Sequence, residues 1–295
     1  MSSWADDDAL VLSGGPRAAR TGESPAATPD HSGSTAASAA EAELPGAALS
    51  MRVLTMNTHK GFTLFNRRFV LEDLRHAIRS VDADLVFLQE VQGIHAGHSI
   101  RVASWPEATH YEYLADSIWP QFAYGRNAVY PAGHHGNAML SKYPIVSHEN
   151  HDASFDGHEG RGLLHCVLSI PGHASDVHAI CVHLGLRERH RRDQLALLCG
   201  VVGEHVPAAA PLLVAGDFND WRQRADRILA REASLREVFA LANGRAALTY
   251  PALWPLLALD RIYVRNALWH RPLALPRLPW ARLSDHAPLA AEIMW

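Results

Sequence analysis

Short apolar runs that end at small polar residues, proline or glycine divide the chain after residue 50 into a series of segments. Runs of this kind are typical of strands with at least one buried face. They predict strands at residues 51–56, 84–90, 137–140, 145–148, 162–170, 176–184, 211–216, 259–264, 267–273 and 288–294. The Pro171-Gly172 turn predicts that the two strands beside it form a hairpin.

Apolar residues at helical spacing predict amphipathic helices at residues 67–80 and 187–205, the second with its arginines on the outer face. Shorter helices are expected near residues 107–115 and 224–231, whereas the rest of 91–136 reads as long loops. Strands outnumber helices and several are linked as hairpins. We therefore expect an α/β (α+β) fold, with mixed sheets and helices outside them, in one domain spanning residues 49–295.

Residues 1–48 have a different character. They are rich in alanine, serine, glycine and proline and have almost no aromatic or branched apolar residues after Leu12, which predicts a disordered, low-complexity tail. Residues 1–50 hold seven acidic and two basic residues, so the remainder carries 24 acidic and 25 basic residues and is nearly neutral. A neutral domain gives no general electrostatic argument for binding nucleic acid.

The composition, 48% hydrophobic and 20% charged, is that of a soluble globular protein. No stretch reaches the roughly 18 consecutive apolar residues that a membrane span needs. The first residues also lack the basic-then-apolar pattern of a secretory signal. Cys166, Cys181 and Cys199 lie inside apolar runs and are expected to be buried free thiols. These features together predict a cytoplasmic protein.

The apolar run at residues 211–215 leads directly into Gly216-Asp217-Phe218-Asn219. Alone, this pattern is typical of an Asx turn that closes a strand. A buried strand would equally place a carboxylate and an amide at the rim of a sheet, where loops on a rigid scaffold carry functional groups. The other strand ends decide between the two interpretations.

Polar groups suited to metal or phosphate binding recur at or near the ends of other predicted strands: Asn57, Glu90, His183, Asp260, Asp285 and His286. Each alone has an ordinary explanation as a cap, a turn residue, an ion-pair partner or a core histidine. Their recurrence at strand after strand predicts one shared site. Carboxylate and amide oxygens suit Mg²⁺ or Mn²⁺ rather than zinc, and histidines supply proton transfer or charge stabilisation near neutral pH.

These residues also belong to short motifs in a fixed order along the chain. After the strand that ends at Asn57 come Leu88-Gln89-Glu90, Gly136-Asn137-Ala138-Met139, Val182-His183-Leu184, Gly216-Asp217-Phe218-Asn219, Leu259-Asp260-Arg261-Ile262 and Ser284-Asp285-His286. In this order the chain resembles the endonuclease/exonuclease/phosphatase superfamily, which has the DNase I-like fold. The resemblance covers residues 51–295, and its most specific part is Gly-Asp-Phe-Asn followed about 70 residues later by Ser-Asp-His.

The resemblance implies a four-layered αββα sandwich of two packed mixed sheets and metal-dependent cleavage of phosphodiester bonds. It implies that Glu90 is the principal ligand of Mg²⁺ or Mn²⁺, with Asn57 and Asp285 close to the ion. Asn137, of the Gly-Asn motif, is expected to bind substrate. Arg161 could also bind a phosphate, although a surface arginine beside a glycine turn explains it equally well.

The same resemblance implies the catalytic roles. Asp217 would position or deprotonate the attacking water, and Asn219 would hold a phosphate oxygen. His286, oriented by Asp260, would contact the scissile phosphate as an acid/base or a charge stabiliser. His183 would contact the phosphate from the other side.

The substrate class stays open at this level. We favour a nuclease-type enzyme acting on DNA or RNA, for which residues 187–192 and Arg126 offer basic contacts with a phosphate backbone, although the solvated face of a helix is the commoner explanation of residues 187–192. A phospholipid or small phosphate ester is the alternative, because Trp254, Trp269 and Trp280 could form an apolar rim. A catalytically silent binding protein of the same fold is the least favoured reading, since the chain keeps every catalytic residue type.

Overall fold

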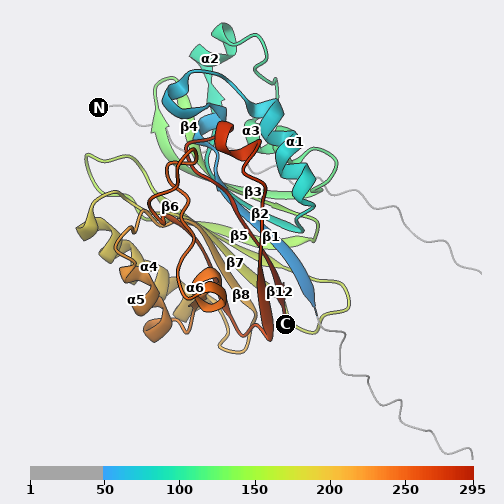
Figure 1. Ribbon diagram of the computed structural model, residues 1–295, viewed down its shortest axis with the longest axis vertical. Helices are drawn as coiled ribbons and strands as arrows, with labels where there is room; N and C mark the ends of the chain where they lie inside the picture. Colours follow the sequence, from blue (N-terminus) through green and yellow to red (C-terminus); the bar gives the residue numbers. More distant parts are fainter. Residues whose placement is uncertain (1–48) are drawn as a thin grey trace, which may run out of the picture. The chain divides into compact units, whose positions relative to one another are not determined.

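The computed structural model describes residues 49–295, and the tail predicted at residues 1–48 lies outside them. Two six-stranded sheets pack face to face, with helices on their outer sides (Figure 1). The first sheet has the order β11 (Trp269–Leu273), β12 (Leu289–Met294), β1 (Ser50–Asn57), β2 (Leu85–His95), β4 (Gly133–Ser141) and β3 (Gln121–Tyr130). The second has the order β5 (Ile145–Asp152), β6 (Gly162–Leu168), β7 (Val177–His183), β8 (Leu212–Asp217), β10 (Asp260–Arg265) and β9 (Arg236–Glu237).

Both sheets are mixed. The pairs β1–β2 and β7–β8 run parallel, whereas every other neighbouring pair is antiparallel. The first sheet packs its outer face on α1 (Leu71–Val81) and α3 (His110–Ala115). The second packs its outer face on α4 (Glu188–His205) and α5 (Arg224–Glu232). The predicted four-layered αββα sandwich of two mixed sheets is confirmed.

The central strands are buried on both faces, which explains why they read as unbroken apolar runs. In β1, Met51 and Val53 enter the layer between the sheets, whereas Leu54 and Met56 pack under α1. The same alternation holds in β8, where Ala215 points between the sheets and Val214 points towards α4. Side chains therefore alternate between an inter-sheet layer and an outer, helix-covered layer.

The prediction of loops over residues 91–136 is wrong. This region contains the end of β2, α2 (Ala96–Arg101), the whole of β3 and the start of β4. The strand β3 lies at the edge of its sheet, and its buried side is made of small residues such as Ala123, Gly125 and Ala128. Small residues on a half-exposed strand leave no apolar run, so the hydrophobic pattern could not reveal it. The short elements β9 and α6 (Val238–Asn243) were missed as well.

Three smaller expectations also need correction. The helix expected at 67–80 begins only at Leu71. Arg191 does not lie on the outer face of α4: it is buried and donates to the carbonyl groups of Gly185 and Leu186. All three cysteines are free, but Cys199 is only half-buried. Within residues 49–295, no helix is long and apolar enough to cross a membrane.

Candidate active site

Eight of the predicted site residues line one cavity of about 380 Å³ at one end of the sandwich: Asn57, Glu90, Arg161, His183, Asp217, Asn219, Asp285 and His286. Asp260 lies directly behind this set, with its Oδ2 atom 2.8 Å from Nδ1 of His286. The structure therefore brings together residues that are separated by more than 200 positions in the sequence.

Strand periodicity explains this convergence. In β1, β7, β8 and β10, alternate residues point into the layer between the sheets, and Asn57, His183, Asp217 and Asp260 continue that face at the strand ends. Asp217 lies opposite His183 on β7 and opposite Asp260 on β10. The apolar core of the inter-sheet layer thus gives way to polar groups at its rim.

Glu90 points into the cavity because of an irregularity in β2 and not because of strand alternation. In β2, Leu85 and Phe87 point between the sheets, so regular alternation would turn residue 90 to the outer face. Instead the register shifts between Leu88 and Val91, and Glu90 has a φ of 53°. A bulge with a left-handed residue commonly re-aims a side chain next to a functional site. Here it directs the Glu90 carboxylate towards Asn57 and Lys60, at 3.4 and 2.8 Å.

The Gly216-Asp217-Phe218-Asn219 stretch forms both the turn and the site. The backbone N–H of Asn219 donates to Oδ1 of Asp217 at 2.9 Å, which is an Asx turn, and Asn219 has a φ of 49°. The side-chain amide of Asn219 donates to the carbonyl of Leu184 at 2.9 Å. The turn fixes both side chains and leaves Oδ2 of Asp217 facing the cavity residues.

Gly216 is required by this geometry. Its φ is 146°, and a Cβ atom there would lie 2.0 Å from the carbonyl oxygen of Val182 on the neighbouring strand. We expect Gly216→Ala to lower the free energy of unfolding by at least about 2 kcal/mol, because the strand pair must separate to admit the methyl group. Urea unfolding measures this loss. Gly200→Ala, in α4 with open space around it, is the control and should not destabilise the protein.

His286 and Asp260 form a buried pair. Burial opposes protonation of the imidazole, but the charges of Asp260 and Asp217 outweigh it and raise the pKa of His286 to about 10. His286 is therefore held as an imidazolium at neutral pH, with Nε2 3.8 Å from Oδ2 of Asp217. A fixed positive group of this kind can stabilise developing negative charge or release a proton.

Asp217 lies at the centre of the polar contacts. Its Oδ2 atom is 3.3 Å from Nδ2 of Asn57, 3.6 Å from Nε2 of His183 and 3.8 Å from Nε2 of His286. Burial raises the pKa of Asp217 to about 7, against the opposing charge of His286. Burial and the charge of Arg161 lower the pKa of His183 to about 3, so this imidazole is neutral. A carboxylate with a pKa near the working pH is suited to accept a proton.

Three further residues of the lining carry groups that fit a hard divalent cation. Glu90 and Asp285 supply carboxylates and Asn57 supplies an amide, which are the ligands that Mg²⁺ and Mn²⁺ take. Burial acts against ionisation of Glu90, but the ammonium group of Lys60, 2.8 Å away, lowers its pKa below the ordinary value, so it is a carboxylate. The cavity lining has more acidic groups than lysine and arginine side chains, as a cation site requires.

Asp217, Asp260 and His286 form a second group whose ligand atoms lie within 4.8 Å of one another. In this group Nδ1 of His286 is already bonded to Asp260, and all three side chains are buried. The arrangement is suited to holding and moving a proton.

Sequence reasoning missed eight residues of the lining, among them Lys60, Glu159 and Tyr250. Lys60 pairs with Glu90, and Glu159 accepts from Arg161 at 2.8 Å. The polar turn after Asn57 and the Glu159-Gly160-Arg161 segment were visible signals, because both flank strands of the site. Tyr250 gave none: its ring lies 5.0 Å from that of His286, on a loop with no motif.

The two predicted substrate-binding residues lie in different settings. Arg161 is buried, lines the cavity and is paired with Glu159. Asn137 is fully buried outside the lining and donates to the carbonyl groups of Gly162 and Cys181, on the facing sheet. Its substrate-binding role stays a prediction, and its position fits holding the two sheets together.

Comparison with known proteins identifies a family and a close relative of this chain. Residues 54–286 match the Endonuclease/Exonuclease/phosphatase family. An uncharacterised protein of Escherichia coli strain K12, YbhP, is 58% identical over 244 residues, which cover 83% of this chain and 96% of that protein. The family match over residues 54–286 includes every residue that lines the cavity.

Solved structures share the fold. An endonuclease/exonuclease/phosphatase from Beutenbergia cavernae superposes with a TM-score of 0.63 at 19% identity, covering 83% of this chain and 71% of that one. The human Nocturnin catalytic domain with bound sulfate anion gives a TM-score of 0.63 at 20% identity, and the match covers 83% of this chain and 93% of that one. At these identities the likeness establishes the sandwich architecture alone.

Proposed function

The chain belongs to the endonuclease/exonuclease/phosphatase family, as its motifs predicted, and we propose that it is a divalent-metal-dependent hydrolase of phosphodiester bonds. One observation carries the proposal. The carboxylates of Glu90 and Asp285 and the amide of Asn57 border the same cavity as the Asp217 carboxylate, one neutral histidine and one protonated histidine. Phosphodiester hydrolysis needs these parts, because it adds negative charge to phosphate oxygens and consumes a water molecule.

The metal-binding residues would be Glu90, Asn57 and Asp285. When bound, Mg²⁺ or Mn²⁺ supplies positive charge that stabilises the phosphate oxygens. Asp217 holds the attacking water through Oδ2 and accepts its proton as the oxygen attacks phosphorus. Its pKa of about 7 suits this step, because a base with a pKa near the operating pH is both available and effective.

The two histidines have complementary tasks. His286, kept as an imidazolium by Asp260, faces the negative charge of the phosphate and can donate a proton to the departing oxygen. His183, neutral and 3.6 Å from Asp217, donates a hydrogen bond to a phosphate oxygen. Asn219 keeps one amide hydrogen free of its bond to Leu184 and holds a second phosphate oxygen.

A groove next to the cavity supports a nuclease-type substrate. Asp285 lines both the cavity and this groove, which has a volume of about 630 Å³. The groove carries two exposed aromatic side chains, Phe65 and Trp254, and basic side chains that include Arg67 and Arg282. Aromatic platforms next to guanidinium groups are the usual contacts of single-stranded nucleic acid, since bases stack and phosphates pair.

The same loops favour a second candidate, a phospholipid or small phosphate ester. Trp254 and Leu256 are 71% and 72% exposed, and Phe65 is 72% exposed. Exposed apolar groups at the mouth of a site can contact acyl chains. The other tryptophans named for this role do not extend the rim: Trp280 is buried, and Trp269 lies on β11.

A substrate panel tests the proposal and separates the candidates. Single-stranded DNA, supercoiled DNA, RNA, phospholipid vesicles, an inositol phosphate and an aryl phosphodiester are incubated with protein and Mg²⁺ or Mn²⁺. We expect hydrolysis of the aryl diester and of single-stranded nucleic acid, and none in EDTA. Trp254→Ala should slow nucleic acid turnover and spare the aryl diester. Turnover of the phospholipid alone would select the second candidate, and no turnover of any ester would favour a silent binding protein.

A further inference from the structure

A group of histidines lies on the outer face of the second sheet, away from the active site. Glu149 and His151 are on β5, His165 is on β6, His178 is on β7, and His205 is the last residue of α4. His178 is near the start of β7, whereas His183 ends it. At about 3.3 Å per residue the two lie about 16 Å apart along the strand. The group is therefore independent of the catalytic cavity.

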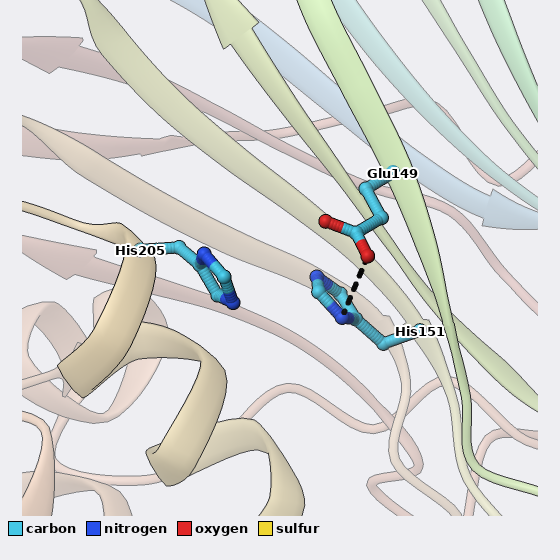
Figure 2. A group of neighbouring side chains, drawn as sticks. All are labelled: Glu149, His151 and His205. Carbon is cyan, nitrogen blue, oxygen red and sulfur yellow. Dashed lines mark ion pairs between the residues drawn. The ribbon is translucent and has the colours of Figure 1, made fainter.

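Strand register gathers these side chains on one face. Glu149 lies directly opposite His165, and His151 is two residues further along β5, so all three point to the same side. The C-terminal turn of α4 crosses this face and brings His205 to it, with its ring 5.3 Å from that of His151. Figure 2 shows Glu149 and His151 projecting from the strand towards His205 on the helix.

The geometry of Glu149, His151 and His205 is close to that of a metal site. Each offers one ligand atom, and these atoms all lie within 4.8 Å of one another. When a carboxylate oxygen and an imidazole nitrogen each lie about 2.1 Å from a tetrahedral metal ion, the two ligand atoms are about 3.4 Å from one another. The Glu149 carboxylate and Nδ1 of His151 are already 3.7 Å apart. Small rotamer adjustments of two partly exposed side chains would close the remaining gap.

One buried nitrogen gives independent support. Nε2 of His151 is buried and has no hydrogen-bond partner anywhere in residues 49–295. A buried polar atom without a partner is costly and calls for an explanation. A cation bound at Nε2 would satisfy this nitrogen once the exposed Glu149 side chain, now beside Nδ1, turns towards it.

The surroundings also favour a cation. The end of α4 places the negative end of the helix dipole at His205. Beneath the group, Nε2 of His165 and Nδ1 of His178 are 3.0 Å apart and share a hydrogen bond. That bond requires one of the two nitrogens to be unprotonated, so the pair does not carry two positive charges.

We propose that Glu149, His151 and His205 form a second metal site, specific for a borderline transition-metal ion such as Zn²⁺. Two imidazoles and one carboxylate are ligands that Zn²⁺ and its neighbours take, whereas the catalytic cavity offers mainly oxygen donors. Three protein ligands leave room for water on the exposed side. The ion joins β5, the edge strand of its sheet, to the end of α4. Metal binding is therefore expected to stabilise the edge of the second sheet formed by β5.

Zinc binding to the full-length, untagged chain tests this site. The protein is stripped with chelator, dialysed into excess Mg²⁺ to fill the oxygen-donor cavity, and titrated with Zn²⁺ in a calorimeter. The Glu149→Gln/His205→Gln double variant should lose one equivalent of Zn²⁺ or bind it at least about tenfold more weakly, since even outer-shell changes cost about 10–100-fold. Both substituted side chains are partly exposed, so the variant is expected to fold.

His148→Ala is the matched control, because His148 is exposed on the same strand and faces the opposite side of the sheet. Zn²⁺ should raise the unfolding temperature of the wild type and of His148→Ala, and not that of the double variant. Hydrolysis of an aryl phosphodiester with Mg²⁺ should be equal in all three proteins, which keeps this test separate from the proposed function. Identical Zn²⁺ titrations of wild type and double variant would overturn the second site.

Discussion

Replacing Asp217 with asparagine is expected to lower kcat on a phosphodiester by a factor of about 10²–10⁴ while the protein stays folded. Asparagine keeps the shape of the side chain but cannot accept the proton of the attacking water. Stability should hold or rise above pH 7. The reason is that the folded-state pKa of Asp217, about 7, lies above its ordinary value, so the ionised carboxylate destabilises the fold.

Asp220 provides the matched control for this experiment. It is buried three residues further along the same loop, lies outside the cavity lining, and accepts from the backbone N–H of Ala225 at 2.7 Å. Asp220→Ala should cost about 1–3 kcal/mol of stability, because it leaves a buried donor unsatisfied, and should keep most of kcat. Thermal unfolding and initial rates of both variants give the comparison. If Asp217→Asn retained wild-type kcat, another group would have to be the base.

The second large effect is expected for the His286–Asp260 pair. His286→Gln should lower kcat by about 10²–10⁴-fold, because the fixed positive charge and the exchangeable proton are both lost. Asp260→Asn should lower it substantially as well, since the imidazole then loses the carboxylate 2.8 Å away that keeps it protonated. The effects of substituting residues that act as a unit do not add, so the double variant should have a kcat little lower than that of His286→Gln alone. Fully additive losses would contradict a shared role.

The same pair predicts a pH dependence of stability in the metal-free protein. The folded-state pKa of His286, about 10, lies above its ordinary value of 6.5. Its contribution to stability is therefore complete below about pH 6.5 and is lost as the pH rises towards 10. Urea unfolding at a series of pH values should show this decline in the wild type and a flatter profile in His286→Gln. Parallel profiles would mean that His286 is not held as an imidazolium.

The sequence predicted most of the fold because the central strands are buried on both faces and read as apolar runs. It failed where burial depends on partners that are far away in the chain. The buried face of the edge strand β3 consists of alanine and glycine, so it leaves no apolar pattern in the sequence. Arg191 was expected on the outer face of α4 because it is charged, but its side chain is buried. The cation–π contact of Arg191 with Trp221, which lies in the loop before α5, could not be anticipated from local pattern.

The site was predictable to the extent that strand alternation placed its residues. Asn57, His183, Asp217 and Asp260 each continue an inward-facing series, so the strand ends alone indicated a shared location. Glu90 is the exception, because only a bulge turns it inward, and its place came from the motif and not from the pattern. Tyr250, which lies beside His286, is on a loop whose path depends on tertiary packing.

The central claim is that the protein hydrolyses phosphodiesters with a divalent metal held by Glu90, Asn57 and Asp285. The most direct measurement is the rate of hydrolysis of an aryl phosphodiester by chelator-treated protein as Mg²⁺ or Mn²⁺ is added back, for the wild type and for Glu90→Gln. We expect no turnover without metal, full recovery in the wild type, and recovery in the variant only at much higher metal concentration. Equal turnover in EDTA, or identical metal curves for the two proteins, would contradict the account.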